Sequence, residues 1–248
     1  MASYEDLNGR LVLITGGANG IGQAMVEAFH AQGAIISFCD IDQAGGKRLV
    51  KCLGERVSFT KVDLSREIEI KRWIAREAKL HGEIHVLVNN AARDPRITLE
   101  KMTVKEWDDL FASNLRAYFL TCREASPHLV EGASVINFSS ITFHNGPEEM
   151  SAYVATKSAA IGFTRSLARE LGSRRIRVNI ISPGWIMTDR QLKQYVSPSI
   201  KRELKKIQCI PDLNQPEEVA EVALFLASDV SRAVTGQEIL VDRGWTHS

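Results

Sequence analysis

A tyrosine and a lysine stand four residues apart, a spacing that places a phenol and an ammonium side by side in a helix. Residues 153–157 read Tyr-Val-Ala-Thr-Lys, which puts Tyr153 and Lys157 on one face of a helix. A free tyrosine is a poor base at neutral pH because its pKa lies near ~10, but a nearby positive charge favours the phenolate. The same spacing is common in ordinary surface pairs, so the pair alone leaves both interpretations open.

Ser140 is a candidate third member of this group. The apolar run Val135–Phe138 is typical of a buried strand, and it ends in Ser139-Ser140. A loop after this strand would carry the Ser140 hydroxyl to the phenol of Tyr153. The helix that holds Tyr153 and Lys157 continues, because apolar residues recur at Ala159, Ala160, Phe163, Leu167 and Leu171.

A glycine-rich turn follows the first apolar run of the chain. Gly16, Gly20 and Gly22 form the pattern G-x-x-x-G-x-G at the start of a helix-like stretch. Such glycines permit a tight turn, a close approach of the backbone to a pyrophosphate and close packing of helix on strand. Glycines also serve plain turns, but a strand before and a helix after favour dinucleotide binding. The turn contains no Gly-Lys-Ser/Thr, which excludes a P-loop NTPase.

Asp40 ends the second apolar run. An acid about 20 residues beyond the glycine turn is the position that binds the ribose 2′-hydroxyl of NAD and repels the 2′-phosphate of NADP. The alternative is an ordinary turn residue in Asp40-Ile41-Asp42. No Arg or Lys lies between Gly16 and Gly22 or directly after Asp40. We therefore expect NAD to be preferred, with use of NADP left open.

Short apolar runs rich in Val and Ile alternate with helix-like stretches along the whole chain. Runs that do not alternate apolar with polar residues are typical of strands buried on both faces of a parallel sheet. The pattern predicts an α/β fold, a single-domain Rossmann-type doubly wound parallel sheet of about seven strands over residues 1–248. The predicted strands are Leu11–Ile14, Ala34–Cys39, Val57–Val62, Ile84–Val88, Val135–Phe138, Val178–Ile181 and Ile239–Val241.

Three helices are predicted with boundaries: Ile21–Gln32, Ser65–Leu80 and Asp212–Ala227. In the second, Ser65 is the expected N-cap, and Ile68, Trp73 and Ile74 form the expected buried face. The alternation is weakest between Gly184 and Gln215. An insertion near the carboxyl end of a strand is typical of a substrate lid, which we expect around residues 185–212.

Composition and charge exclude several classes of protein. Among 248 residues, 31 Lys and Arg nearly balance 30 Asp and Glu. This charge balance does not favour binding to nucleic acid or to an anionic membrane. The four cysteines contain no Cys-x-x-Cys pair and the six histidines no cluster, so we predict no metal site. The N-terminus lacks a signal-peptide pattern, and no run approaches the ~20 apolar residues of a membrane span. We therefore expect a cytoplasmic protein that binds neither nucleic acid nor membrane.

Taken together, the motifs resemble those of the short-chain dehydrogenase/reductase family over nearly the whole chain. This resemblance implies an NAD(P)-dependent oxidoreductase that transfers a hydride between substrate and nicotinamide. It also implies a homotetramer, with helices near residues 103–123 and 151–171 between subunits. The motifs are Thr15-Gly16-x-x-x-Gly20-Ile21-Gly22, Asp63-Leu64, Asn89-Asn90-Ala91, Asn114, Ser140, Tyr153-x-x-x-Lys157, Asn179, Pro183-Gly184 and Thr188.

The resemblance also implies residue roles. Tyr153 would be the general base, Lys157 would lower its pKa and hold the nicotinamide ribose, and Ser140 would orient the reacting oxygen. Asn114 would position a water that links Lys157 to solvent; the alternative is a buried asparagine satisfied by backbone. The implied cofactor-binding residues are Gly16, Asn19, Gly20, Ile21, Asp40, Asp63, Leu64, Asn90, Tyr153, Lys157, Pro183, Gly184, Ile186 and Thr188.

A narrower resemblance concerns the substrate. Segments such as Asp94-x-Arg96, Arg190-Gln191 and Asp242-x-Gly244-Trp245 are similar to those of bacterial aldose 1-dehydrogenases of the pentose- and deoxyhexose-oxidising type. That resemblance implies oxidation of an aldose at C1 to the aldonolactone. Polar side chains suit a polyhydroxylated sugar, because each buried hydroxyl needs a partner, although a solvated lid helix would have the same composition. The expected substrate contacts are Asp94, Arg96, Ser140, His144, Glu148, Tyr153, Arg190 and Gln191, although a lone histidine such as His144 is more often structural.

Two other functions stay open. One is a polyol dehydrogenase or a 3-oxoacyl, steroid or xenobiotic carbonyl reductase on the same scaffold. Activity found only with NADPH and a ketone would indicate this function. The other is a nucleotide-sensing or scaffolding protein without catalysis. Intact Ser140, Tyr153 and Lys157 argue against the second.

Overall fold

A single parallel sheet lies at the centre of the molecule. The computed structural model describes residues 2–246. The strands pair in the order β3-β2-β1-β4-β5-β6-β7, and every neighbouring pair is parallel. Each predicted run forms a strand, so the predicted α/β fold is confirmed. The strands are β1 (Leu11–Thr15), β2 (Ile35–Asp40), β3 (Val57–Lys61), β4 (Ile84–Asn89), β5 (Leu129–Phe138), β6 (Arg177–Pro183) and β7 (Glu238–Val241).

The strand order reverses between β1 and β4, and helices connect the strands. From β1 the sheet grows through β2 and β3 on one side and through β4 to β7 on the other. In such sheets, ligands bind outside the carboxyl ends of the strands at the reversal point. The helices are α1 (Gly20–Ala31), α2 (Gln43–Leu53), α3 (Glu67–His81), α4 (Val104–Phe111), α5 (Ala117–Ala125), α6 (Thr142–Asn145), α7 (Ser151–Leu171), α8 (Asp189–Gln194), α9 (Pro198–Ile207) and α10 (Pro216–Ala227).

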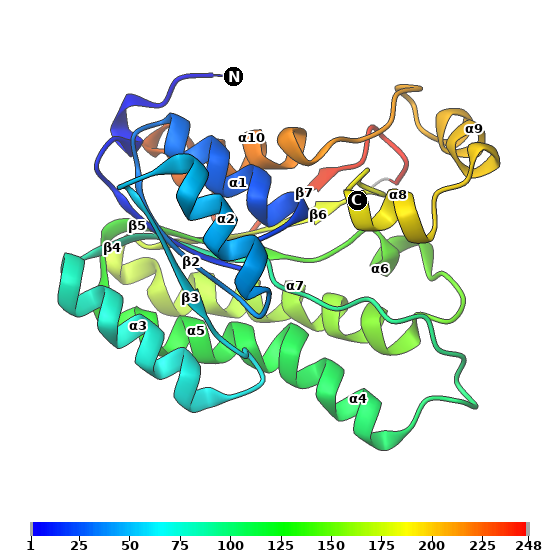
Figure 1. The fold of residues 1–248 in the computed structure, drawn as a ribbon, viewed down its shortest axis with the longest axis horizontal. Coiled ribbons are helices and arrows are strands. Elements are labelled where there is room, and N and C mark those ends of the chain that lie inside the picture. The colour runs from blue at the N-terminus through cyan, green and yellow to red at the C-terminus, as the bar shows by residue number, and fades with distance from the viewer. Residues whose placement is uncertain (1, 247–248) are drawn as a thin grey trace.

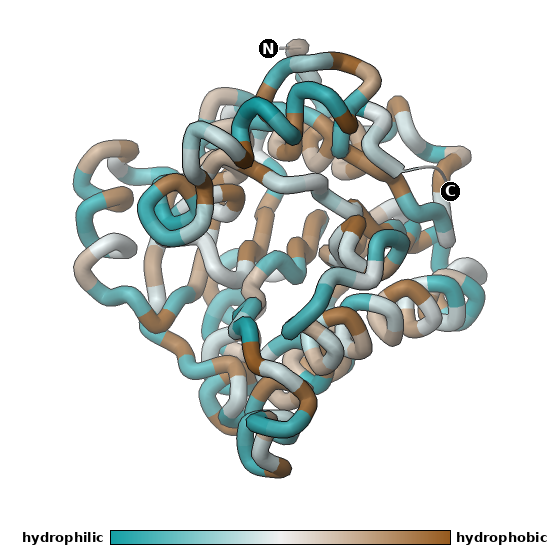
Figure 2. Tube along the Cα trace, turned by 90° about the vertical axis from the view of Figure 1, so that its right-hand side faces the viewer, coloured by the Kyte–Doolittle hydropathy of each residue, from teal (hydrophilic) through white to brown (hydrophobic). Residues whose placement is uncertain are grey.

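Helices cover both faces of the sheet. Figure 1 shows α1, α2 and α10 above it, α3, α4, α5 and α7 below it, and α8 and α9 projecting at one end. Successive side chains of a strand point to opposite faces, so Val12 and Ile14 join the core under α1 and α10, while Leu11 and Leu13 join the core over α3, α5 and α7. Figure 2 shows hydrophobic residues concentrated on the central strands. No helix within residues 2–246 is long and apolar enough to cross a bilayer.

The start of α3 differs from the sequence-based expectation. The helix begins at Glu67, and Arg66 rather than Ser65 occupies the N-cap position. The Ser65 hydroxyl instead donates to Asp63 Oδ1 at 2.7 Å, because a turn precedes the helix. Ile68, predicted to be buried, is 46% exposed, so the prediction was wrong at this turn.

The last long helix starts later than predicted. Helix α10 begins at Pro216 rather than Asp212, since proline lacks an N–H and fits a first helical turn. Glu218 accepts the backbone N–H of Gln215 at 2.8 Å and closes this end. The segment predicted as a lid contains α8 and α9, two short helices between β6 and α10.

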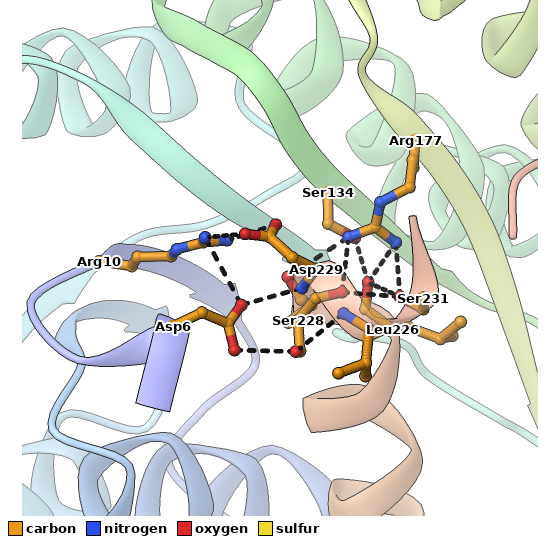
Figure 3. A network of polar contacts seen from close by, with 10 residues as sticks. Asp6, Arg10, Ser134, Arg177, Leu226, Ser228, Asp229 and Ser231 are labelled. Carbon is orange, nitrogen blue, oxygen red and sulfur yellow. Dashed lines mark hydrogen bonds and ion pairs between the residues drawn. The ribbon is translucent and has the colours of Figure 1, made fainter. Parts of the chain in front are cut away.

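A buried arginine closes the other end of α10 (Figure 3). Arg177, at the start of β6, is 5% exposed. Its guanidinium donates to the carbonyl of Leu226 at 2.6 Å, to that of Ser228 at 3.2 Å and to the hydroxyl of Ser231 at 2.8 Å. A cation at a helix C-terminus satisfies carbonyls that have no partner within the helix and complements the helix dipole.

The same corner holds the N-terminal segment. Asp6 accepts from the Ser228 hydroxyl and from the backbone N–H of Asp229, each at 2.9 Å. Arg10 pairs with Asp229 at 2.6 Å. These contacts join the short helix η1 (Glu5–Leu7), the end of α10 and, through Arg177, the sheet.

We expect Arg177→Ala to lower the free energy of unfolding by about 2–4 kcal/mol, because the change removes several buried hydrogen bonds from a guanidinium to the end of α10. Urea denaturation measures the loss. Arg175→Ala is the matched control: its ion pair with Glu131 is exposed on both sides, so its loss should cost about 0.5 kcal/mol or less. Equal small losses for both variants would contradict a structural role for Arg177.

Candidate active site

A cleft of about 1250 Å³ opens at the carboxyl ends of the central strands. Its lining includes residues that directly follow β1, β4, β5 and β6, namely Gly16, Asn90, Ser139 and Gly184. The cleft therefore lies at the reversal point of the sheet, where the topology predicts a ligand.

The glycine turn forms one wall of this cleft. Gly16 and Gly20 have φ of +69° and +56°, a region that favours glycine. A Cβ on Gly22 would lie 1.8 Å from the carbonyl oxygen of Gly16, so only glycine fits there. The side chain of Asn19 does not cap α1 but donates to Asp42 Oδ2 at 2.9 Å. Because the first turn of α1 carries no acidic residue, its N–H groups suit an anionic ligand.

Asn90 and Asp40 hold the turn from two sides. Asn90 Nδ2 donates to the carbonyls of Thr15 and Gly16, each at 3.1 Å. The Asp40 carboxylate accepts the N–H groups of Ala18 and Asp42, each at 3.0 Å. An acidic group is thus fixed at the end of β2, beside the glycine turn.

These features fit a nicotinamide dinucleotide. The helix N-terminus matches its pyrophosphate and Asp40 matches a ribose hydroxyl. When bound, the dinucleotide supplies the hydride acceptor. The structure brings all of the expected cofactor residues to the cleft, namely Gly16, Asn19, Gly20, Ile21, Asp40, Asp63, Leu64, Asn90, Tyr153, Lys157, Pro183, Gly184, Ile186 and Thr188.

Tyr153 and Lys157 lie in the first two turns of α7, at the floor of the cleft. Lys157 is fully buried, and its Nζ donates to the carbonyl of Phe138 at 2.9 Å and to the hydroxyl of Tyr118 at 3.2 Å. Nζ lies 5.7 Å from the centroid of the Tyr153 ring. The Ser139 hydroxyl donates to the Lys157 carbonyl at 2.9 Å, which fixes α7 against the end of β5.

Burial acts in opposite directions on the two groups. It raises the pKa of Tyr153, as does the negative charge of Asp94, while a hydrogen bond with Ser140 and the charge of Arg190 act to lower it. Burial lowers the pKa of Lys157 to about 7, against the opposing charge of Asp94. Burial and the charge of Asp94 thus outweigh the hydrogen bond with Ser140 and the charge of Arg190. The lowering expected from Lys157 and a bound nicotinamide stays a prediction.

A polar network lies at the open end of the cleft, above Tyr153. Asp94, in the loop after β4, pairs with Arg190 of α8. Gln191 Nε2 donates to the other Asp94 oxygen at 3.1 Å, and Trp185 Nε1 donates to Gln191 Oε1 at 2.9 Å. These contacts fasten the predicted lid to the loop after β4.

In the same region, the guanidinium of Arg96 packs on two aromatic rings. Its guanidinium lies 4.0 Å from the centroid of the Tyr195 ring and 5.5 Å from that of Trp185. Glu148, from the loop before α7, also lines the cleft. The structure thus gathers Asp94, Arg96, Ser140, Glu148, Tyr153, Arg190 and Gln191 at one end of the cleft.

His144 and Asn114 do not face the cleft. The His144 ring contacts Glu238 of β7 at 3.1 Å. Asn114 is fully buried, and its amide accepts the N–H of Arg93 at 2.9 Å and donates to the carbonyl of Arg93 at 2.8 Å. His144 is therefore placed as a structural histidine, and the structure does not support a substrate contact for it. Asn114 is placed as a buried asparagine whose amide is satisfied by backbone groups, the alternative to a water-positioning role.

Sequence reasoning missed Trp185 and Tyr118. Trp185 directly follows Pro183-Gly184 at the carboxyl end of β6, so its position at a strand end was a usable signal. Tyr118 lies one helical turn after Asn114, and only the fold brings it to Lys157.

Comparison with known proteins identifies the family. The family model described as Enoyl-(Acyl carrier protein) reductase matches residues 16–246. The chain is 42% identical to a probable galactose dehydrogenase of Rhizobium meliloti (strain 1021), covering 98% of this chain and 97% of that protein. Given this match and the Tyr153–Lys157 site, the chain belongs to the short-chain dehydrogenase/reductase family and is an NAD(P)-dependent oxidoreductase.

Other relatives include both a 3-oxoacyl reductase and a sugar dehydrogenase. The chain is 35% identical to the 3-oxoacyl-(acyl-carrier-protein) reductase FabG of Chlamydia pneumoniae (97% and 98% covered). It is 37% identical to the D-xylose 1-dehydrogenase of Caulobacter vibrioides (strain NA1000 / CB15N), with 98% of each chain covered. A crystal structure described as a short-chain glucose/ribitol dehydrogenase from Brucella melitensis superposes with a TM-score of 0.95 at 30% identity, over 100% of both chains.

We expect Tyr153→Phe to lower turnover by about 10²–10⁴-fold, because the variant lacks the phenol that we expect to take the substrate proton. NADH binding, followed by fluorescence, should change little. The assay is nicotinamide reduction with an alcohol that the wild-type enzyme oxidises. Near-normal turnover in the variant would exclude Tyr153 as the base.

We expect Asp94→Asn to move the acid limb of the pH–rate profile for oxidation to lower pH by about 0.5–1 unit. Oxidation needs unprotonated Tyr153, and the negative charge of Asp94 raises the pKa of Tyr153, so its removal lowers that pKa. Glu148→Gln is the matched control, since Glu148 lines the cleft but is not among the groups that shift Tyr153. An acid limb that stays in place or moves upward in Asp94→Asn would contradict this coupling.

Proposed function

We propose that this protein oxidises an aldose at C1 to the aldonolactone and prefers NAD. The observation that carries the proposal is the hydrogen-bonding lining of the substrate end, where Asp94, Arg190, Gln191 and Trp185 surround the approach to Tyr153. A sugar presents a hydroxyl on nearly every carbon, and each buried hydroxyl needs a partner. An acyl chain or steroid would offer no hydrogen bonds to these groups, whereas sugar hydroxyls can add to the bonds that the groups already make with one another.

In this proposal each residue near Tyr153 has a separate role in the reaction or in substrate binding. Tyr153 accepts the proton of the C1 hydroxyl, Ser140 orients that oxygen, and Lys157 supplies the positive charge that favours the phenolate. Asp94, Arg190 and Gln191 bind the remaining hydroxyls. The galactose and xylose dehydrogenases among the relatives support a sugar substrate.

The preference for NAD rests on Asp40. Its carboxylate is held at the end of β2 by two backbone N–H groups, where its charge would repel a 2′-phosphate. Asp42, which accepts from Asn19 beside it, adds a second negative charge. Arg48 also lines this part of the cleft, so NADP retains one positive partner.

A carbonyl reductase is the second candidate. The FabG relative and the enoyl-reductase description of the family model favour it. A 3-oxoacyl substrate needs an apolar path for its chain, whereas Asp94 and Arg190 place charges near Tyr153. The aldose proposal accounts for these charges.

We also propose that the protein forms a homotetramer through α4, α5 and α7. The partly exposed Trp107 and Phe119 support this, since α4 and α5 carry them on the outer surface of that layer. Trp107 stacks on Phe111 with ring centroids 4.8 Å apart, which widens the apolar patch.

We expect fast reduction of NAD with one stereochemical group of aldoses, tested with D-galactose, D-xylose, L-arabinose, L-fucose and D-glucose. Rates with NADP should be lower by tenfold or more, at about 1.4 kcal/mol per factor of ten. Polyols and simple alcohols serve as controls. Activity confined to NADPH and ketones would favour the carbonyl reductase, and tight NAD binding without any turnover would favour a nucleotide sensor.

A further inference from the structure

Tyr118 is a buried phenol that the chemistry described above does not use. It lies in the first turn of α5 and is 1% exposed. The turn before it, η2 (Ala112–Arg116), is π-helical, and such widened turns are frequent at functional sites. Its ring packs in a small apolar cluster with Ala160, Ile161 and Ile180, so the orientation of the phenol is fixed.

The Tyr118 hydroxyl lies between the ammonium of Lys157 and a backbone carbonyl. Lys157 Nζ donates to this hydroxyl at 3.2 Å, and the hydroxyl donates to the carbonyl of Phe138 at 3.2 Å. Nζ also donates to the same carbonyl directly, at 2.9 Å. Three groups from α7, α5 and β5 therefore form a closed triangle beneath the cleft.

This triangle restricts Lys157. A lysine ammonium has three N–H donors, and two of them are used by Phe138 and Tyr118. The third is left for the cleft, so the direction of the charge toward Tyr153 follows from the other two bonds. A hydrogen bond to the ammonium also stabilises the charged form of a group that burial disfavours.

Tyr118 acts here as a neutral hydrogen-bonding group. Burial, together with Tyr153 and Cys122, raises its pKa well above the usual range, so the phenol keeps its proton. It does not line the cleft, and it reaches the reaction only through Lys157.

We propose that Tyr118 is a positioning residue for the reaction, whose phenol holds and orients the Lys157 ammonium that acts on Tyr153. The proposal concerns the site of the function proposed above. It rests on that function only for the choice of assay substrate.

A change of Tyr118 to Phe alters none of the other charged and titratable groups nearby. Lys157 is faced by Tyr153 on its own helix and by the charge of Asp94 from the loop after β4. Arg190 of α8 acts on Tyr153, and Cys122 of α5 acts on Tyr118. A changed pH response in Tyr118→Phe would therefore report the lost hydroxyl.

The first test measures the pKa of Lys157 directly. Protein labelled with [ε-¹³C]lysine is titrated by NMR, and the Lys157 signal is assigned by its loss in Lys157→Met. In Tyr118→Phe the pKa of Lys157 should fall by about one unit, since one hydrogen bond to the charged form is lost. An unchanged pKa would overturn the proposal.

Thr121→Val is the matched control. It removes a second buried hydroxyl from α5, one that bonds Asn89 and not Lys157. Thermal denaturation checks that both variants are folded, and only Tyr118→Phe should change the titration of Lys157. Equal shifts in the two variants would indicate a purely structural effect and would also overturn the proposal.

The second test is kinetic and uses D-galactose with NAD, or whichever aldose of the panel is fastest. With less ammonium present, the pKa of Tyr153 rises, so the acid limb of kcat in Tyr118→Phe should move to higher pH. At neutral pH kcat should fall about tenfold with KM nearly unchanged, which matches a one-unit shift. A fall in kcat equal at all pH values would contradict the proposal. If the wild type oxidises no aldose, the proposed function fails, and the NMR titration still decides the role of Tyr118.

Discussion

Lys157 holds its amino group inside the protein, where a charge costs free energy unless hydrogen bonds replace the lost water. Its two acceptors within the protein belong to different elements, the end of β5 and the first turn of α5. Both contacts require α7 to pack against β5 and β6, in the helix layer below the sheet. The fold therefore determines where the ammonium lies, and Tyr153, one turn earlier on α7, shares that position.

The electrostatics of the site follow from the same burial. The interior lowers the pKa of Lys157 and raises that of Tyr153, so the proton equilibrium of the pair responds to every charge brought near it. Asp94 is one such charge, and it also pairs with Arg190 of α8. One carboxylate thus contacts the segment predicted to be a lid and also raises the pKa of Tyr153.

Much of this arrangement can be predicted from the sequence. Strands buried on both faces appear as continuous apolar runs, and the glycines of the turn stand at positions where other residues are strained or do not fit. All strands, the glycine turn, Asp40 and the Tyr153–Lys157 pair belong to this group. The rest depends on contacts between distant segments. Ser65 was a plausible helix cap until its hydroxyl proved to bond Asp63. His144 was a plausible sugar ligand, but β7 places Glu238 beside it. Arg177 and Tyr118 act through partners that no sequence pattern pairs with them.

We propose that the cleft oxidises a sugar at its anomeric carbon. Incubation of the enzyme with NAD and D-galactose deuterated at C1 tests it most directly, with the reduced nicotinamide analysed by mass spectrometry and NMR. We expect the deuterium to appear at C4 of the reduced nicotinamide in step with formation of the lactone. Reduced cofactor without deuterium would show that another carbon is oxidised. No reduction with C1-deuterated galactose or xylose would contradict the assignment of a sugar substrate.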